Sequence, residues 1–176
     1  MEPIHYVPIG IVRSPHTDPA STPRQTESAR GIAGRVELDP QFAPSLKDLA
    51  EFDYLWLLVH FHAAQEGRAL WQRAQGPREV QAGDAQPDLP ARAAGALEVV
   101  TAKGEPAHGV FATRAPFRPN PIGLSLVRLV RIEDATLYIE DIDLLDGTPV
   151  LDIKPYVPKL DNRETDRIGW FARRLH

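Results

Sequence analysis

Proline is the feature that most constrains the fold of this chain, because 17 of its 176 residues are proline, about twice the usual share. Each proline fixes φ, lacks a backbone donor and restricts the residue before it. Long helices and inner strands tolerate such residues poorly. The chain is therefore predicted to form many short strands joined by fixed turns rather than a helical bundle.

The overall composition is typical of one soluble globular domain, with 43% apolar and 25% charged residues. The absence of cysteine excludes disulfides and thiolate metal sites. The start of the chain does not resemble a signal peptide, and no run of 18 apolar residues occurs. We therefore expect a cytoplasmic protein with no membrane partner. A net charge of -4 argues against a surface covered by basic patches for nonspecific nucleic-acid binding.

Short apolar segments at regular spacing supply the predicted strands. They are residues 6–13, 34–38, 54–61, 96–101, 110–113, 124–133, 136–142 and 150–153. Segment 54–61 is apolar on both faces, which predicts a buried central strand. Short helices are expected at 46–51, capped by Ser45, and at 70–75. Asp146-Gly147 is a dipeptide favoured in tight hairpin turns. These patterns predict a barrel or a sandwich.

The most distinctive loop is GVFATRAPFRPNPIG, residues 109–123. Its three prolines stiffen a backbone that displays Arg114, Arg118 and Asn120. Arginine suits carboxylate or phosphate, and a stiff loop loses little entropy on binding. The alternative is a surface connection with solvated arginines. A second long loop, residues 14–34, offers Arg24 and Gln25 as binding candidates.

Acidic residues gather in the last third of the chain. Segment 134–152 contains six acids and no Lys or Arg: Asp134, Glu140, Asp141, Asp143, Asp146 and Asp152. Asp143 and Asp146 are candidates to hold a cation or accept a proton, with turn capping as the competing explanation. Lys154 shares a face with Asp152 if this segment is extended, so a simple surface ion pair is the alternative to a role for Lys154 in binding.

Other types of chemistry lack support. His60 and His62 would share a face of a strand, but nothing further completes a set of metal ligands, so a metal site is rejected. The sequence has no Gly-x-Ser-x-Gly, Gly-x-Gly-x-x-Gly or Walker-type motif. Serine hydrolase, Rossmann and P-loop chemistries are therefore not expected.

Five motifs taken together resemble the TrmO (TsaA-like) family of S-adenosylmethionine-dependent tRNA methyltransferases. They are PIGIVRSP, Pro23-Arg24-Gln25, FDYLWLLVHFH, GVFATRAPFRPNPIGLSLVRL and DLLDGTPVLDIKPYVP. The resemblance implies an all-β fold, a single-sheeted antiparallel β-barrel with short flanking helices and long loops, working as a homodimer. It also implies methylation of N6 of threonylcarbamoyl-adenosine at position 37, in the tRNA anticodon loop. The barrel domain would span residues 1–160 with an insertion at 63–95, followed by a tail at 161–176.

The resemblance also assigns residues to roles. The implied S-adenosylmethionine pocket consists of Arg24, Gln25, Thr26, Glu27, Phe61, His62, Thr113, Arg114, Leu124, Asp141, Ile142, Asp143 and Leu144. Asp143 or Asp146 is the hypothetical base that removes the N6 proton, because that nitrogen is conjugated with a carbonyl and is a weak nucleophile. Arg118, Asn120, Lys154 and Tyr156 are expected to hold the tRNA.

Two departures from the family pattern bear on substrate contacts. Ala115 replaces the usual serine after Arg114, and LEVVTAKGEPAH stands where relatives have an Arg-Pro-Pro-Arg-like stretch. The tail carries four arginines beside Trp170 and Phe171, so it is expected either to dock on the body or to contact an anionic partner. The alternative function is an S-adenosylmethionine-binding barrel that acts on another substrate or senses the cofactor without tRNA methylation.

Overall fold

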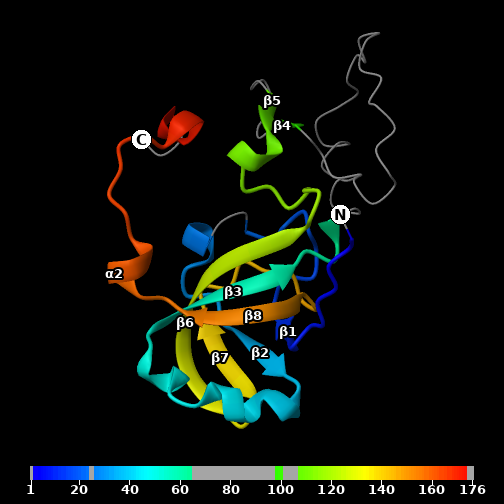
Figure 1. The fold of residues 1–176 in the computed structure, drawn as a ribbon, viewed down its shortest axis with the longest axis vertical. Helices are drawn as coiled ribbons and strands as arrows, with labels where there is room; N and C mark the ends of the chain where they lie inside the picture. The colour runs from blue at the N-terminus through cyan, green and yellow to red at the C-terminus, as the bar shows by residue number, and fades with distance from the viewer. Residues whose placement is uncertain (1, 24–25, 65–97, 101–106, 174–176) are drawn as a thin grey trace.

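The computed structural model describes residues 2–23, 26–64, 98–100 and 107–173. Six strands form one closed antiparallel barrel in the order β1-β2-β7-β6-β3-β8 (Figure 1). The strands are β1 (Gly10–Arg13), β2 (Gly34–Leu38), β3 (Tyr54–His60), β6 (Ile122–Glu133), β7 (Thr136–Glu140) and β8 (Pro149–Pro155). The predicted all-β, single-sheeted antiparallel barrel is confirmed. The predicted helix at 70–75 and most of the 63–95 insertion lie outside the described residues.

The barrel encloses a core of aliphatic side chains. Burial alternates along β3 and along the first half of β6, so Leu55, Leu57 and Val59 point inward beside Val127. The two strands pair in register, Leu55 with Val127 and Val59 with Gly123. This alternation is what closing one sheet around one core requires. The outward side chains of β3 are half-buried or exposed, so the prediction that both of its faces are buried is wrong.

One end of the barrel gathers the segments that contain most of the predicted site. The end of β3 pairs with the start of β6, and Phe61 N donates to Pro121 O at 2.8 Å. The second half of β1 contacts the loop before β8, where Gly147 N donates to Val12 O at 2.9 Å. The loop from Asp141 to Thr148, between β7 and β8, therefore lies beside the starts of β6 and β8. We call this loop the acidic loop, and we call the end of the barrel where it lies the site end.

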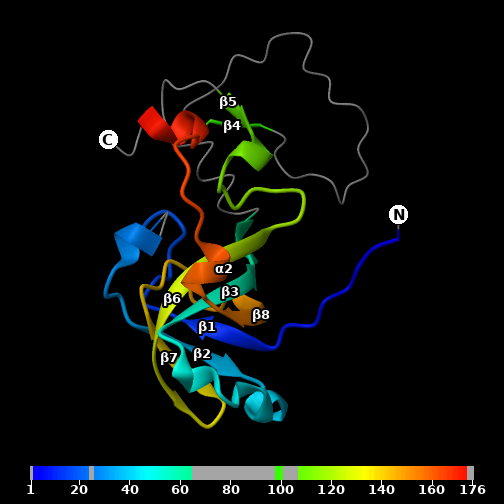
Figure 2. The ribbon, with the colours of Figure 1, turned by 60° about the vertical axis from the view of Figure 1, so that its left-hand side comes forward.

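A small second layer stands above the site end (Figures 1 and 2). It contains the two-stranded sheet of β4 (Glu98–Val100) and β5 (Ala107–Gly109), the 3-10 helix η5 (Val110–Ala112) and the C-terminal 3-10 helix η6 (Gly169–Arg173). Trp170 Nε1 donates to Ala112 O at 2.8 Å, and the indole stacks on His108 with centroids 4.5 Å apart. The tail thus docks on the body, one of the two outcomes expected from the sequence.

The remaining helices are short: η1 (Thr26–Ala29), η2 (Pro40–Leu46), η3 (Leu49–Glu51) and α2 (Pro158–Asp161). The predicted Ser45-capped helix is wrong. Asp39 instead caps η2 by accepting from Gln41 N at 3.0 Å, and the left-handed φ of +66° at Asp48 separates η2 from η3. Among the described residues, no helix is long and apolar enough to cross a membrane.

Two predicted strands differ from the structure. The strand predicted at 110–113 is wrong, because η5 occupies it and Thr113 closes that turn through Oγ1 to Val110 O at 2.8 Å. The first strand begins at Gly10 rather than residue 6, since Tyr6 and Val7 are exposed. Asp146-Gly147 does form a turn, closed by Thr148 N to Leu145 O, with φ +77° at Gly147. That turn lies within a longer connection rather than a two-residue hairpin.

Candidate functional site

The carboxylate of Asp143 is the centre of a hydroxyl network at the site end. Its Oδ1 accepts from Ser125 Oγ at 2.7 Å, and its Oδ2 accepts from Thr26 Oγ1 at 3.0 Å. Ser125 belongs to the buried inner face of β6, whereas Thr26 begins η1. A carboxylate has about four lone-pair sites, so two hydroxyl donors leave capacity for a substrate proton. Asp143 therefore lies between the barrel interior and the loop that the sequence assigns to the cofactor.

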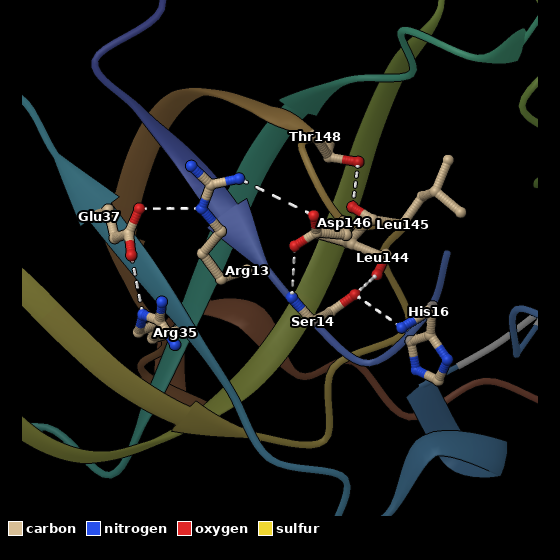
Figure 3. Close-up of polar contacts among 9 residues, drawn as sticks. All are labelled: Arg13, Ser14, His16, Arg35, Glu37, Leu144, Leu145, Asp146 and Thr148. Carbon is tan, nitrogen blue, oxygen red and sulfur yellow. Dashed lines mark hydrogen bonds and ion pairs between the residues drawn. The ribbon is translucent and has the colours of Figure 1, made fainter. Parts of the chain in front are cut away.

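Asp146 has a different environment, shown in Figure 3. Its Oδ1 accepts from the backbone of Ser14 at 3.1 Å, and its Oδ2 lies 3.8 Å from Nη1 of Arg13. Ser14 Oγ also donates to Leu144 O at 2.7 Å. These contacts tie the end of β1 to the acidic loop. Both oxygens of Asp146 thus hold the fold together, which is the turn-stabilising alternative raised by the sequence.

The start of the acidic loop is held by hydrogen bonds that each join a side chain to a backbone group. Asp141 has φ +67° and accepts from Gly31 N at 2.7 Å through its carboxylate. Ile142 is fully buried, and its carbonyl lies 3.0 Å from Nε2 of His16. Because segments 14–16 and 31–32 grip this loop from two sides, its carboxylates are fixed in position before any ligand binds.

Phe61 and Gly123 form an apolar wall beside this network. A Cβ built on Gly123 would lie 2.4 Å from Cζ of Phe61 and 2.8 Å from Cγ2 of Val59. The ring therefore packs directly on the glycine backbone, an approach that no larger residue permits. Nε2 of His62 lies 4.0 Å from the corresponding position at Gly147. Phe61 and His62 thus reach across the site end from β3 toward the starts of β6 and β8.

Arg118 folds the proline-rich loop onto itself. Its Nη1 donates to Thr113 O at 3.0 Å and to Ala115 O at 3.1 Å. Thr113 is buried, whereas Arg114 and Asn120 are exposed. The guanidinium of Arg118 is therefore used within the loop, while Arg114 and Asn120 are directed to solvent.

A groove of about 510 Å³ runs along the outer face of the barrel. Its lining residues are Thr26, Arg30, Tyr54, Leu126, Arg128, Asp141 and Tyr156. Thr26 belongs both to this groove and to the Asp143 network, so the two features adjoin. Leu124 lies next along the outward row of β6 and is half exposed. Because Leu124 and Ser125 face opposite ways, a ligand touching Leu124 and Asp143 must reach around the start of β6.

Lys154 and Tyr156 lie toward the other end of β8. Nζ of Lys154 is 2.8 Å from Oδ2 of Asp152, so the ion pair considered from the sequence is present. Tyr156 packs edge-on against Trp56 and Tyr54. The predicted tRNA-binding residues are therefore divided between the two ends of the barrel, with Arg118 and Asn120 at one end and Lys154 and Tyr156 toward the other. Tyr156 lines the groove, whereas Lys154 is not among its lining residues.

The ion pairs that shift pKa values lie outside the Asp143 network. Hydrogen bonding from Arg13, and then from Arg35, lowers the pKa of Glu37 below its usual 4.5. Arg13 donates to Glu37 at 2.9 Å and Arg35 at 2.8 Å (Figure 3). In the part of the chain that the structure describes, no three His, Asp or Glu side chains are grouped to hold a metal.

The family of the chain follows from a comparison with protein-family models. The model of the tRNA-methyltransferase O N-terminal domain matches residues 11–162, which include the whole acidic loop and both arms of the Asp143 network. The chain belongs to the tRNA-methyltransferase O family.

Relatives in this family resemble the chain over most of its length. A probable S-adenosyl-L-methionine-binding protein of Pyrococcus abyssi is 44% identical over 98% of this chain and 79% of the relative. The tRNA (adenine(37)-N6)-methyltransferase of Escherichia coli is 34% identical over 90% of this chain and 60% of that enzyme. The crystal structure of TrmO from Pseudomonas aeruginosa has a TM-score of 0.67 at 35% identity, covering 96% of this chain and 63% of that one. The chain thus spans less than two thirds of these two bacterial relatives.

Several of the residues that the resemblance to the tRNA-methyltransferase O family assigns to the cofactor pocket lie together at the site end of the barrel. They are Thr26, Phe61, His62 and residues 141–144. Arg24 and Gln25 lie outside the described residues, as does the side chain of Glu27. Sequence reasoning missed Ser125, which donates to Asp143 from inside the barrel. The signal was a single hydroxyl among aliphatic residues on the inward face of a strand. The groove residues Tyr54 and Arg128 lie inside two of the quoted motifs but were given no role, because nothing in the sequence shows that they meet.

Proposed function

We propose that this chain is an S-adenosylmethionine-dependent methyltransferase that methylates N6 of threonylcarbamoyl-adenosine at position 37 of tRNA. The observation that carries the proposal is the Asp143 carboxylate, held by Ser125 and Thr26 at the site end of a barrel of this family. The name of the Escherichia coli relative supports the reaction, and that of the Pyrococcus relative supports the cofactor.

The residues present fit the chemistry of S-adenosylmethionine. Its sulfonium favours a nearby anion or carbonyls, its carboxylate a cation, and its adenine an apolar wall. Asp143 and the acidic loop offer the anion and the carbonyls, exposed Arg114 offers the cation, and half-buried Phe61 offers the apolar wall. Thr113, Leu124 and the loop at residues 24–27 would complete the pocket. When bound, the cofactor supplies the electrophilic methyl group.

Asp143 acts as the general base in this proposal. The lone pair of the acceptor nitrogen is delocalised into the neighbouring carbonyl, so removal of its proton makes it a competent nucleophile. The proton would pass to Asp143, directly or through water, and the nitrogen would bond to the methyl carbon as the carbon–sulfur bond of the donor breaks and a neutral thioether leaves. Ser125 and Thr26 fix the orientation of the carboxylate, because each binds a different oxygen. Holding the acceptor nitrogen in line with the methyl group supplies much of the remaining rate enhancement.

The first prediction separates the two candidate bases. Asp143→Asn is expected to lower kcat about 100-fold or more, the usual contribution of a general base, and to weaken cofactor binding by a smaller factor, because the carboxylate also faces the sulfonium in this proposal. Asp146→Asn is expected to lower Tm, because it weakens contacts to Ser14 and Arg13, and to reduce turnover less than tenfold. Single-turnover methylation and calorimetric titration measure both effects. Full turnover by Asp143→Asn would rule out its role as the base.

We further propose that Asn120 contacts the tRNA, with Arg118 acting mainly through the loop that it braces. Lys154, two residues before Tyr156 in the chain, would add positive charge despite its partner Asp152. The barrel domain at 1–160, the insertion at 63–95 and the tail at 161–176 form one cytoplasmic chain in this proposal. Steep loss of tRNA binding with added salt supports such phosphate contacts.

Homodimer formation is part of the same proposal. Ile122 and Leu124 expose 44% and 51% of their surface on the outward face of β6, and an adjacent pair of exposed aliphatic side chains suits a protein contact. Light scattering of the full chain tests it, with Leu124→Glu as the disrupting variant.

The rival function is a sensor that binds the cofactor without transferring its methyl group. Incubation with labelled cofactor and tRNA, with and without the threonylcarbamoyl group, distinguishes the two. Label only in the modified tRNA supports the proposed reaction, and cofactor binding without label in either tRNA supports the sensor.

A further inference from the structure

The groove on the outer face of β6 has an aromatic wall that the Asp143 network does not use. Tyr54 lies opposite Arg128 in the β3–β6 register, and Leu126, the neighbouring outward residue of β6, is an apolar part of the same lining. Tyr156 meets Tyr54 at 79° with centroids 6.4 Å apart, and it meets Trp56 at 76° and 5.7 Å. These edge contacts hold the Tyr156 ring in one orientation. A flat ligand would therefore find rings that are already ordered.

The polar lining of the groove contains both donors and acceptors. Arg30 and Arg128 contribute guanidinium groups, and Arg128 is paired with Glu140. Asp141 lines the same space and accepts from Gly31 N. A phosphate would face this carboxylate at a cost, whereas the edge of a nucleobase carries donors and acceptors that match both kinds of group. The mixed lining thus favours a base over a phosphate.

The size and position of the groove suit one unstacked nucleotide. A volume of about 510 Å³ lies within the range of small-ligand sites. Thr26 forms one wall of the groove and donates to Asp143, so an occupant would lie beside the proposed reacting position. Sequence-specific proteins commonly stack splayed bases of single-stranded RNA loops on tyrosine rings.

We propose that this groove binds the nucleobase next to the methylated adenosine, stacked on Tyr54 and Tyr156 and contacted at its edge by Arg30 and Asp141. The inference rests on the proposed function and adds a neighbouring base to the recognised substrate. A loop opened in this way would present the acceptor base to Asp143 while its neighbour occupies the groove.

The test uses the full chain and tRNA with matched tyrosine variants. Tyr54→Leu and Tyr156→Leu keep apolar volume but remove the stacking rings, and each is expected to raise the KM for tRNA about tenfold. Cofactor affinity and kcat should change less than twofold. Tyr54→Phe and Tyr156→Phe, which keep the rings, should retain the wild-type KM. Tyr138→Leu is the control, because it removes a tyrosine ring that is not among the residues lining the groove. Tyr138 lies on β7, where the Arg131 guanidinium carbon is 3.5 Å from the centroid of its ring.

A second readout does not depend on catalysis. An anticodon stem–loop with 2-aminopurine beside the target adenosine should lose fluorescence on binding the wild-type chain, and lose less with either leucine variant. Active enzyme with unchanged fluorescence, or leucine variants with wild-type KM, would overturn the inference. Dissociation of a dimer by these variants would also overturn it, by making the groove a protein contact. If the wild-type chain methylates no tRNA, the proposed function fails first, and the fluorescence still tests the groove.

Discussion

Arg118 and Gly123 show how single residues shape the site without any chemistry of their own. Arg118 donates from Nη1 to two carbonyls of its own loop, and these hydrogen bonds fix the turn after Thr113. Gly123 allows Phe61 to pack on its backbone. Both positions lie between the residues assigned to the cofactor and those assigned to tRNA. Their side chains, or the lack of one, therefore determine where the neighbouring groups can lie.

Gly123→Ala is expected to displace Phe61, because the added Cβ would meet its ring at 2.4 Å. Overpacking of this kind costs about 1–3 kcal/mol of stability, and the shifted ring should weaken cofactor binding. Thermal unfolding and calorimetric titration measure the two effects. Gly109→Ala is the matched control, since nothing lies within 4 Å of its Cβ position. Equal behaviour of the two variants would show that the Phe61 contact is unimportant.

Residue roles were the hardest part to predict from sequence. The carboxylates of the acidic loop stood out because charge is segregated along the chain, but their separate environments depend on contacts with Ser14, Thr26 and Ser125 from distant segments. The Asp152–Lys154 pair was predictable, because both residues lie two apart on one strand. Tyr156 was expected to contact tRNA, but its contact with Tyr54 depends on the β3–β8 pairing, so no local pattern predicts that the two rings meet.

At the level of elements, the C-terminal helix η6 acts as a brace on the segment that leads into the proline-rich loop. Trp170 stacks on His108 of β5, packs against Phe171 with centroids 4.0 Å apart and donates to the carbonyl of Ala112. Ala112 lies directly before Thr113, a residue assigned to the cofactor pocket. The position of this pocket segment thus depends on a helix 58 positions later in the chain.

Trp170→Ala is expected to raise the cofactor Kd about three- to tenfold, because the loss of one hydrogen bond and two stacking contacts frees η5. The Tm of the barrel should change little, since the indole contacts β5 and η5, which are not part of the barrel sheet. Ile168→Ala, on the same segment and 41% exposed, is the control. An unchanged Kd for Trp170→Ala would show that the brace does not reach the pocket.

Strands were predicted more accurately than helices, for a physical reason. Short apolar segments locate β2, β3, β6 and β7 to within a few residues. The segment at 110–113 has strand-like composition, yet Thr113 turns back to Val110 and makes a 3-10 helix. Likewise, Asp39 and Pro40 start η2 earlier than Ser45 because a carboxylate cap and a proline at the first position cooperate.

For the whole molecule, barrel closure depends on the short contact between β1 and β8. Only Gly10 with Val150 and Ile11 with Pro149 pair in register there. Arg13 adds polar contacts on both sides of β1, since it approaches Asp146 before β8, across this seam, and binds Glu37 on the other neighbour β2 (Figure 3). Side chains on β1 thus reinforce the part of the barrel with the fewest paired residues.

The ion pairs of Glu37 with Arg13 and Arg35, on the β2 side of β1, predict a pH dependence of stability. Arg13, and then Arg35, lowers the pKa of Glu37, so the folded state gains stability from the ionised form above about pH 4.5 and loses it as pH falls through the lower folded value. Glu37→Gln should lower Tm by about 1–3 °C at pH 7, a small effect because the pair is partly exposed. The difference should shrink as pH falls below 4.5 and through the lower folded pKa of Glu37. Glu51→Gln in η3 is the control, and a difference that does not shrink as the pH is lowered would contradict the role of this charge.

Closure of the barrel also has a consequence for biosynthesis. Ser14 and Asp146 lie 132 positions apart, so β1 leaves the ribosome long before its partner β8 has been made. Until then β1 has only β2 to pair with on one side, and its other edge stays open to other chains. Contacts this distant in sequence also slow folding, because the intervening loop must be closed first. The nascent chain therefore passes through a stage with an exposed strand edge, during which chaperone binding would protect it from aggregation.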